Sequence, residues 1–153
     1  MLWFLTHVRR SCDRDRIARA IAEAEAKSTG EIVVSLAPFF IGNIERAAER
    51  AWERLGMART RDRNGVLLFV VPGRRKLFVR GDQGIHEKVG PEFWAEVASA
   101  VSARLAEQGR SKTARTDALV HGVSLVGEAL QKHFPRREWD AKTNQLPDSV
   151  DGR

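Results

Sequence analysis

The sequence has few of the residues that form covalent cross-links, and it lacks long apolar runs. Of its 153 residues only Cys12 is a cysteine, which excludes an intrachain disulfide and a zinc site made of cysteines alone. A single cysteine also favours a reducing compartment. No segment approaches the about 20 apolar residues of a membrane-spanning helix, and no basic segment precedes the short apolar start at residues 2–5. We therefore expect a soluble cytoplasmic protein without a membrane anchor.

Sequence motifs of well-known enzymes and metalloproteins are also missing. His86 and Glu87 do not begin an H-E-x-x-H zinc motif, because Gly90 stands where the second histidine would be. The chain contains no dinucleotide-binding fingerprint, no phosphate-binding P-loop and no D-x-D-x-D-G calcium loop. A nucleophilic triad cannot be assembled from it either. Function therefore has to be inferred from the residues that the fold brings together.

The net charge is positive, but the basic residues are not concentrated in one place. The chain has a formal charge of +6 and a pI near 10.2, which would suit an acidic partner. Its 26 basic residues are nevertheless spread along the sequence beside 20 acidic ones, without a cluster of basic and aromatic side chains. Nucleic acid is therefore not an expected partner, and binding of acidic partners is kept only as an alternative function.

The most hydrophobic stretch, residues 64–82, predicts two strands joined by a tight turn. Residues 66–71 form an unbroken apolar run, which is typical of a strand buried on both faces. Pro72 and Gly73 favour a type II turn, with the glycine at its third position. Residues 76–80 then predict a second strand, nearer the edge of a sheet.

The remaining segments predict helices and one further strand. Residues 31–36 are rich in β-branched side chains and predict that strand. Asp13 and Asn43 are suited to cap helices, and residues 83–90 are expected to connect the hairpin to the next helix. Apolar residues at helical spacing predict helices over residues 13–28, 43–56, 91–109 and 113–133.

This order of elements predicts an α/β fold. A strand–helix–strand unit with a short crossover gives parallel neighbouring strands, and the hairpin adds an antiparallel strand. We expect a small three-layer sandwich, in which helices flank a mixed β-sheet. The domain is predicted to span residues 1–135. Residues 136–153 are predicted to form an extended polar tail, partly anchored by Trp139.

The predicted topology brings acidic residues to one end of the sheet. The start of the first strand carries Glu31, the loop before the second strand carries Asp62, and the end of the third carries Asp82, with Glu87 a few residues beyond. Carboxylates that meet repel one another unless a cation neutralises them. Their oxygens suit calcium or magnesium. The alternative is a set of solvated strand ends, paired with Arg61, Arg63 and Lys88.

Several segments together resemble the TPM domain, a family that includes a thylakoid lumen protein, a photosystem II repair protein and a nematode membrane modulator. The pieces are short, but their order and spacing are fairly specific. The segment at 81–90, and the tail residues 134–135 and 144–148, are similar to stand-alone soluble bacterial members. The resembling residues are 29–34 (TGEIVV), 52–57 (WERLGM), Thr60, 63–68 (RNGVLL) and 81–85 (GDQGI).

The resemblance implies an α/β sandwich and a calcium site made of acidic residues at one end of the sheet. It also implies acid phosphatase activity, which has been attributed to plant members. The signal peptide and C-terminal transmembrane helix of many members are missing here, so a role at a membrane is not expected. We therefore predict a calcium-binding interaction or accessory module with a protein partner, and keep a metal-assisted phosphatase as an alternative.

Overall fold

A mixed β-sheet forms the centre of the molecule. The computed structural model of the chain describes residues 11–108, 111–137 and 150–152. The sheet is 4-stranded with the order β3-β2-β1-β4. β1 (Glu31–Leu36) is parallel to β2 (Gly65–Val71) and to β4 (Val150–Gly152), whereas β3 (Lys76–Gly81) is antiparallel to β2. The predicted parallel β–α–β unit and antiparallel hairpin are therefore confirmed.

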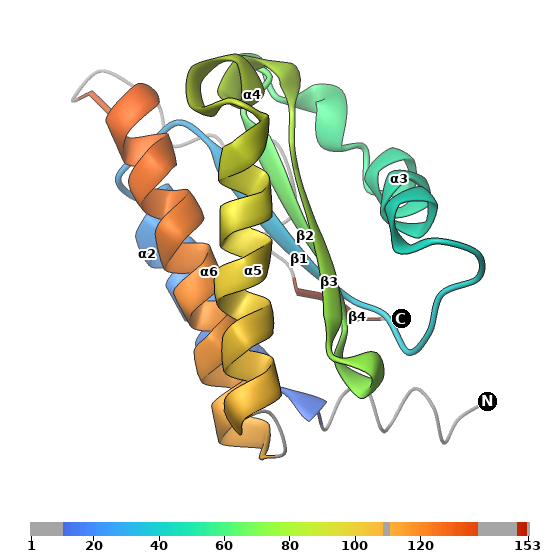
Figure 1. Ribbon diagram of the computed structural model, residues 1–153. Helices are drawn as coiled ribbons and strands as arrows, with labels where there is room; N and C mark the ends of the chain where they lie inside the picture. Colours follow the sequence, from blue (N-terminus) through green and yellow to red (C-terminus); the bar gives the residue numbers. More distant parts are fainter. Residues whose placement is uncertain (1–10, 109–110, 138–149, 153) are drawn as a thin grey trace.

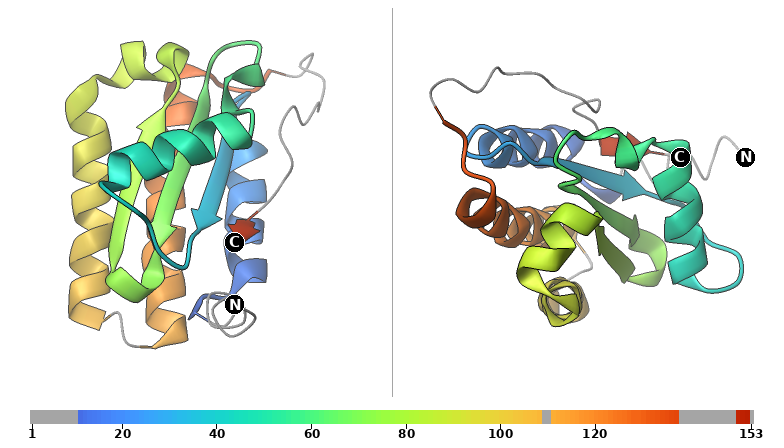
Figure 2. Two further views of the ribbon diagram at one scale, coloured as in Figure 1. Left: turned by 90° about the vertical axis from the view of Figure 1, so that its right-hand side faces the viewer. Right: turned by 90° about the horizontal axis from the view of Figure 1, so that it is seen from above.

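Helices cover both faces of the sheet. α2 (Arg14–Glu25), α5 (Pro91–Gln108) and α6 (Lys112–His133) lie on one face, and α3 (Ile44–Arg54) lies on the other, as Figure 1 and Figure 2 show. The short helix α4 (Gln83–Val89) lies at the end of the sheet where β3 finishes. The α/β class and the three-layer arrangement agree with the sequence prediction.

The apolar run in β2 connects the hydrophobic cores on the two sides of the sheet. Successive side chains of a strand point to opposite faces. Val66, Leu68 and Val70 therefore join the core beneath α2, α5 and α6, whereas Leu67, Phe69 and Val71 join the core beneath α3. Every residue of β2 is buried, which confirms the prediction of a strand buried on both faces.

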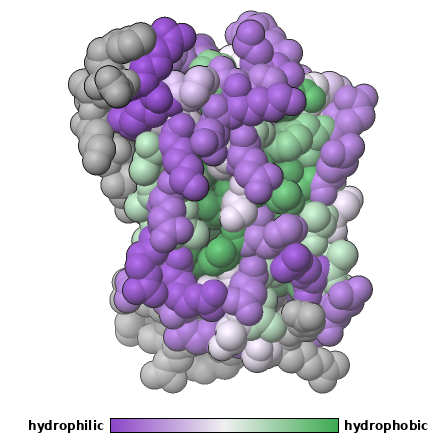
Figure 3. Space-filling model, turned by 90° about the vertical axis from the view of Figure 1, so that its left-hand side faces the viewer, coloured by the Kyte–Doolittle hydropathy of each residue, from purple (hydrophilic) through white to green (hydrophobic). Residues whose placement is uncertain are grey.

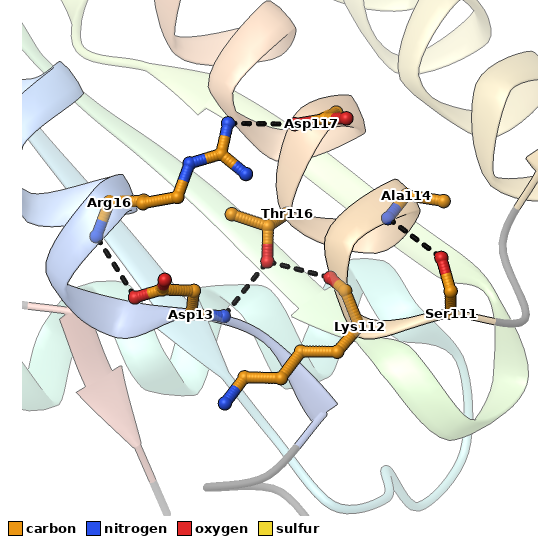
Figure 4. Close-up of polar contacts among 7 residues, drawn as sticks. All are labelled: Asp13, Arg16, Ser111, Lys112, Ala114, Thr116 and Asp117. Atoms are coloured by element: carbon orange, nitrogen blue, oxygen red, sulfur yellow. Dashed lines mark hydrogen bonds and ion pairs between the residues drawn. The ribbon is translucent and has the colours of Figure 1, made fainter.

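A group of polar contacts fixes the beginnings of α2 and α6 to each other, as Figure 4 shows. The buried Thr116 hydroxyl accepts a hydrogen bond from the Asp13 amide at 2.8 Å and donates one to the Lys112 carbonyl at 2.8 Å. The Asp13 carboxylate caps α2 by accepting from the Arg16 amide at 3.2 Å. Arg16 also forms an ion pair with Asp117 at 2.7 Å. These contacts hold two segments that are distant in sequence in a fixed register.

The turn between β2 and β3 differs from the prediction. Residues Pro72–Arg74 form a 3-10 turn, and Arg75, with φ of 52°, takes the left-handed conformation that a type II turn would have given to Gly73. The register pairs Val71 with Lys76, so the connection is longer than a two-residue hairpin turn. Connections of this length are usually built on a helical turn with a left-handed residue near its end.

Two further boundaries differ from the prediction. Residues 83–90 were expected to be a connection, but Gln83–Val89 form α4, which buries Ile85 and ends at Gly90 with φ of 81°. The first helix ends at Glu25 instead of continuing to residue 28. The Thr29 amide, which a longer helix would bond to the Glu25 carbonyl, donates instead to the Phe134 carbonyl at 2.9 Å.

The end of the chain contributes a strand that the sequence did not predict. Val150–Gly152 form β4 and pair in parallel with β1, so that Val150 lies beside Val34. Val150 is buried, and its carbonyl accepts a hydrogen bond from the Arg14 guanidinium. The predicted anchoring by Trp139 lies outside the described residues.

The outer face of the helical layer is largely polar. Figure 3 views the molecule from the side of α2, α5 and α6, where rows of hydrophilic side chains run across the face with apolar groups visible between them. Among the described residues, none of the helices combines the length and the apolar composition that spanning a bilayer needs.

Candidate functional site

The sheet register places two of the predicted acidic residues, Glu31 and Asp82, at the same end of the sheet. Glu31 at the start of β1 pairs with Gly65 at the start of β2. The Asp82 amide, just past the end of β3, donates to the Gly65 carbonyl at 2.9 Å. The two acidic residues therefore flank the same residue of β2. Both are buried.

Asp82 is held in an ion pair by Arg63. The Asp82 carboxylate, whose side chain is 3% exposed, accepts from Arg63 Nε at 2.6 Å and from Arg63 Nη2 at 2.9 Å. It also accepts from the Gln83 amide at 2.8 Å, which caps α4. These bonds, together with the charge of Asp82, raise the pKa of the Arg63 guanidinium. Asp82 thus has the arginine partner that the sequence left open as an alternative.

A second arginine, Arg80 of β3, is influenced by the charge of Asp82. Burial lowers the pKa of the Arg80 guanidinium, and the negative charge of Asp82 acts in the opposite direction. Arg80 forms an ion pair with Glu49 of α3 and lies 4.2 Å from the centre of the Trp52 ring. Arg63 is therefore bonded directly to Asp82, whereas Arg80 is paired with Glu49.

A hydrogen-bond network positions Asp62 in the loop before β2. The Asn64 side chain donates to the Thr29 hydroxyl at 3.1 Å, and this hydroxyl donates to Asp62 Oδ2 at 3.4 Å. The Asn64 amide donates to the Thr60 hydroxyl at 3.1 Å. Unlike Asp82, Asp62 is 38% exposed, and Arg61 lies 3.8 Å from its other oxygen.

Close contact between this loop and α4 requires a glycine at position 84. The Gly84 amide donates to the Arg63 carbonyl at 2.8 Å. A Cβ atom at Gly84 would lie 2.1 Å from the Asp62 carbonyl oxygen, so any side chain would push the two segments apart. Their junction leaves a shallow hollow of about 240 Å³, lined by Arg61, Asp62, Arg63, Gln83, Gly84 and Glu87.

The predicted ligands therefore divide into two pairs. Asp62 and Glu87 line one hollow, where Glu87 Oε1 accepts from the Gln83 side-chain amide at 3.0 Å. Asp82 and Glu31 are buried at the same end of the sheet, and Glu31 is not among the lining residues of the hollow. Within the described residues, no three histidine, cysteine or acidic side chains gather into a group that could hold a metal ion.

The chemistry of the hollow fits calcium in one respect. Calcium takes about 6–8 oxygen ligands, and Asp62, Glu87 and the amide oxygen of Gln83 are oxygen donors that line one space. Water would have to supply the remaining ligands. Because Arg61 and Arg63 also line the hollow and the oxygen donors do not form a protein cage, the residues fit at most a weakly held, hydrated cation.

A larger hollow of about 780 Å³ follows β3, and no sequence motif marks it. Trp94 lines it, and the Trp94 indole nitrogen donates to His86 Nδ1 at 3.0 Å. Arg63 lines both hollows. The sequence predicted that residues 76–80 form a strand near the edge of the sheet. It did not indicate which helices would lie beside that edge.

The fold and the site together define a small three-layer α/β domain with an arginine-neutralised acidic end. The chain belongs to the TPM domain family, whose family model matches residues 9–129. Among solved structures it is similar to the BA42 protein of the psychrophilic bacterium Bizionia argentinensis, with 30% identity, a TM-score of 0.78 and coverage of 90% of each chain.

A second solved structure supports the fold alone. The N-terminal domain of the cg2496 protein from Corynebacterium glutamicum has a TM-score of 0.55 and 16% identity, over 84% of this chain and 74% of that chain. The comparison with curated proteins gives no match. The match of the family model over residues 9–129 confirms the family resemblance noted from the sequence.

Proposed function

We propose that this domain is a calcium-binding interaction module, with the cation bound by Asp62 and Glu87. One observation carries the proposal: carboxylates from two separate segments open onto one hollow. The family resemblance, which implies a calcium site at the acidic end of the sheet, adds support. A metal-assisted phosphatase and a binder of acidic partners stay predictions from the sequence.

Asp82 has a positioning role in this proposal, because its carboxylate holds the Arg63 side chain. A cation at Asp82 would have to displace Arg63, which already neutralises that carboxylate through two hydrogen bonds. Arg63 instead connects the loop before β2 to α4, because its carbonyl accepts a hydrogen bond from the Gly84 amide and its side chain pairs with Asp82. Calcium is favoured over magnesium because magnesium demands near-ideal octahedral geometry, whereas calcium accepts irregular ligand sets.

Thermal unfolding with and without calcium tests the proposal. If the dissociation constant is about 1 mM, as in weak modular sites, then a tenfold excess over that value stabilises the native state by about 1.4 kcal/mol. For a domain of this size the melting temperature should rise by roughly 3–6 °C. The double change Asp62→Asn with Glu87→Gln should remove the rise.

A matched control is Glu107→Gln, which changes an exposed acidic residue at the other end of α5. This variant should keep the full calcium effect. If calcium does not change the melting temperature of the wild-type chain, the proposal is wrong. If the effect survives the double change but disappears in Asp82→Asn, the cation binds at Asp82 in place of Arg63, and our ligand assignment is wrong.

A further inference from the structure

The outer edge of β3 has backbone hydrogen-bonding groups that face away from the sheet. The Asp82 amide bonds directly across to the Gly65 carbonyl, and in an antiparallel pair the bonded residues alternate along the strand. The backbone groups of Arg80 and Phe78 therefore face β2. Those of Gly81 and Val79 point outward, and among the described residues no strand pairs with them.

A groove of about 780 Å³ runs along this edge. Phe78, Val79, Arg80, Gly81 and Asp82 of the β3 segment form its base. Residues of α5 line one wall and residues of α3 line the other, and Figure 1 shows the edge of β3 between these two helices. Neighbouring strands of a sheet lie about 4.8 Å apart, so a strand that paired with this edge would occupy the groove.

The two walls differ in chemistry. On α5 the lining residues are apolar and mostly small: Pro91, Trp94, Ala95 and Ala98. On α3 they are the exposed acidic residues Glu45 and Glu49, of which Glu49 pairs with Arg80. Successive side chains of a strand placed on this edge would point alternately to the two walls. An apolar side chain suits the α5 wall, and a basic side chain suits the α3 wall.

We propose that the edge of β3 binds an extended peptide of alternating apolar and basic residues, which adds to the sheet as a further strand. Main-chain bonds to Val79 and Gly81 would provide affinity, and the two walls would provide specificity. A second copy of the domain does not suit this role, because its own β3 is recessed between its α3 and α5. The groove and the calcium hollow share Arg63, but this proposal does not depend on calcium binding.

A fluorescein-labelled heptapeptide that alternates valine and lysine is the probe. We expect saturable binding to the full chain at submillimolar concentration. In amide spectra of the labelled protein, the Val79 and Gly81 signals should shift and their hydrogen exchange should slow. The same peptide with a central proline, and a peptide alternating valine and glutamate, should each bind at least about tenfold more weakly, because one loses a main-chain donor and the other meets Glu45 and Glu49.

Variants of the walls locate the binding site. Ala95→Trp fills the groove from α5 and should weaken binding by about tenfold or more. Ser99→Trp, an exposed position on the same helix that does not line the groove, should leave it unchanged. Glu45→Gln should weaken binding by roughly two- to fivefold, the range of an exposed ion pair, and Glu53→Gln on α3 is its control.

Some results would overturn this inference. They are an absence of binding at millimolar peptide, equal binding of the proline peptide, or equal binding to the Ala95→Trp variant when its spectrum shows that it is folded. A peptide that binds but shifts only the amide signals of residues outside β3 would also overturn the inference. Because none of these measurements includes calcium, their failure is distinguishable from failure of the calcium proposal.

Discussion

At the scale of single residues, burial decides the chemistry of the only thiol. Cys12 is 1% exposed, and loss of solvation raises the pKa of its thiol above the ordinary value of 9.0. A hydrogen bond donated by Ser11 at 3.8 Å and the charge of Arg115 act in the opposite direction without cancelling this effect. Cys12 therefore remains a protonated core side chain, and not a nucleophile, at neutral pH.

This burial predicts a loss of stability in alkaline solution. Because the folded pKa is above the unfolded one, the native state keeps its proton while the unfolded chain releases it as pH rises past about 9. The free energy of unfolding should then fall by at most about 1.4 kcal/mol per pH unit from this thiol. Denaturant unfolding at pH 7–10 measures it, and the pH profile of Cys12→Ala should lack this part of the decline. Parallel profiles for the two proteins would contradict the prediction.

At the scale of elements, α4 is the segment that makes the acidic end of the sheet. Asp82 caps it, Gly84 allows it to touch the Asp62 and Arg63 carbonyls, and Glu87 lies on its exposed side. A helix of this length has too few turns to show clear apolar periodicity, and so residues 83–90 were predicted as a connection.

Gly84→Ala tests this junction. In an exposed helix the change would stabilise by about 1 kcal/mol, but here the new Cβ would lie 2.1 Å from the Asp62 carbonyl oxygen, which is backbone and has little freedom to move. We expect a net loss of roughly 1–3 kcal/mol in the free energy of unfolding, together with loss of the calcium effect. Chemical denaturation measures the change in the free energy of unfolding.

The control is Gly73→Ala, because a Cβ atom there meets nothing within 4 Å. This change should be neutral or slightly stabilising, by about 0.4–1 kcal/mol at most. Equal stability changes for Gly84→Ala and Gly73→Ala would show that the close contact between α4 and the loop does not contribute to the fold.

At the scale of the whole molecule, β4 attaches the C-terminal segment to the central sheet. β4 pairs with β1 and its Val150 packs into the core below α2, α5 and α6. β4 forms one edge of the sheet and β3 forms the other. An extended partner is expected at the β3 edge because a groove lies along it.

Removal of residues 150–153 should lower the stability of the entire domain. Exposing Val150 and the space it fills costs about 1.5–3 kcal/mol, and Val150→Ala should cost a smaller amount through the cavity it leaves. Urea unfolding of the wild type, the truncated chain and the Val150→Ala variant gives the order of their free energies of unfolding. A truncated chain as stable as the wild type would mean that β4 adds nothing to the sheet.

The sequence by itself determined the segments that form β1, β2, β3 and the main helices. The apolar run of β2 needs burial on both faces, and the spacing of apolar residues in α5 and α6 fits a helix against a sheet. These are local properties, set by the side-chain period of each element. Strand direction then placed Glu31 and Asp82 at one end of the sheet, which the register confirms.

Only the tertiary structure decided which side chains meet at that end. Asp62 and Asp82 are alike in sequence, yet one is exposed in a hollow and the other is buried against Arg63. The difference comes from α4, the left-handed backbone of Arg63 and the contact at Gly84. The tertiary structure also decided the position of β4, because its short pairing leaves no periodic signal in the sequence. Ion pairs and hydrogen bonds depend on distances of a few tenths of an ångström, and a residue pattern specifies faces and ends but not such distances.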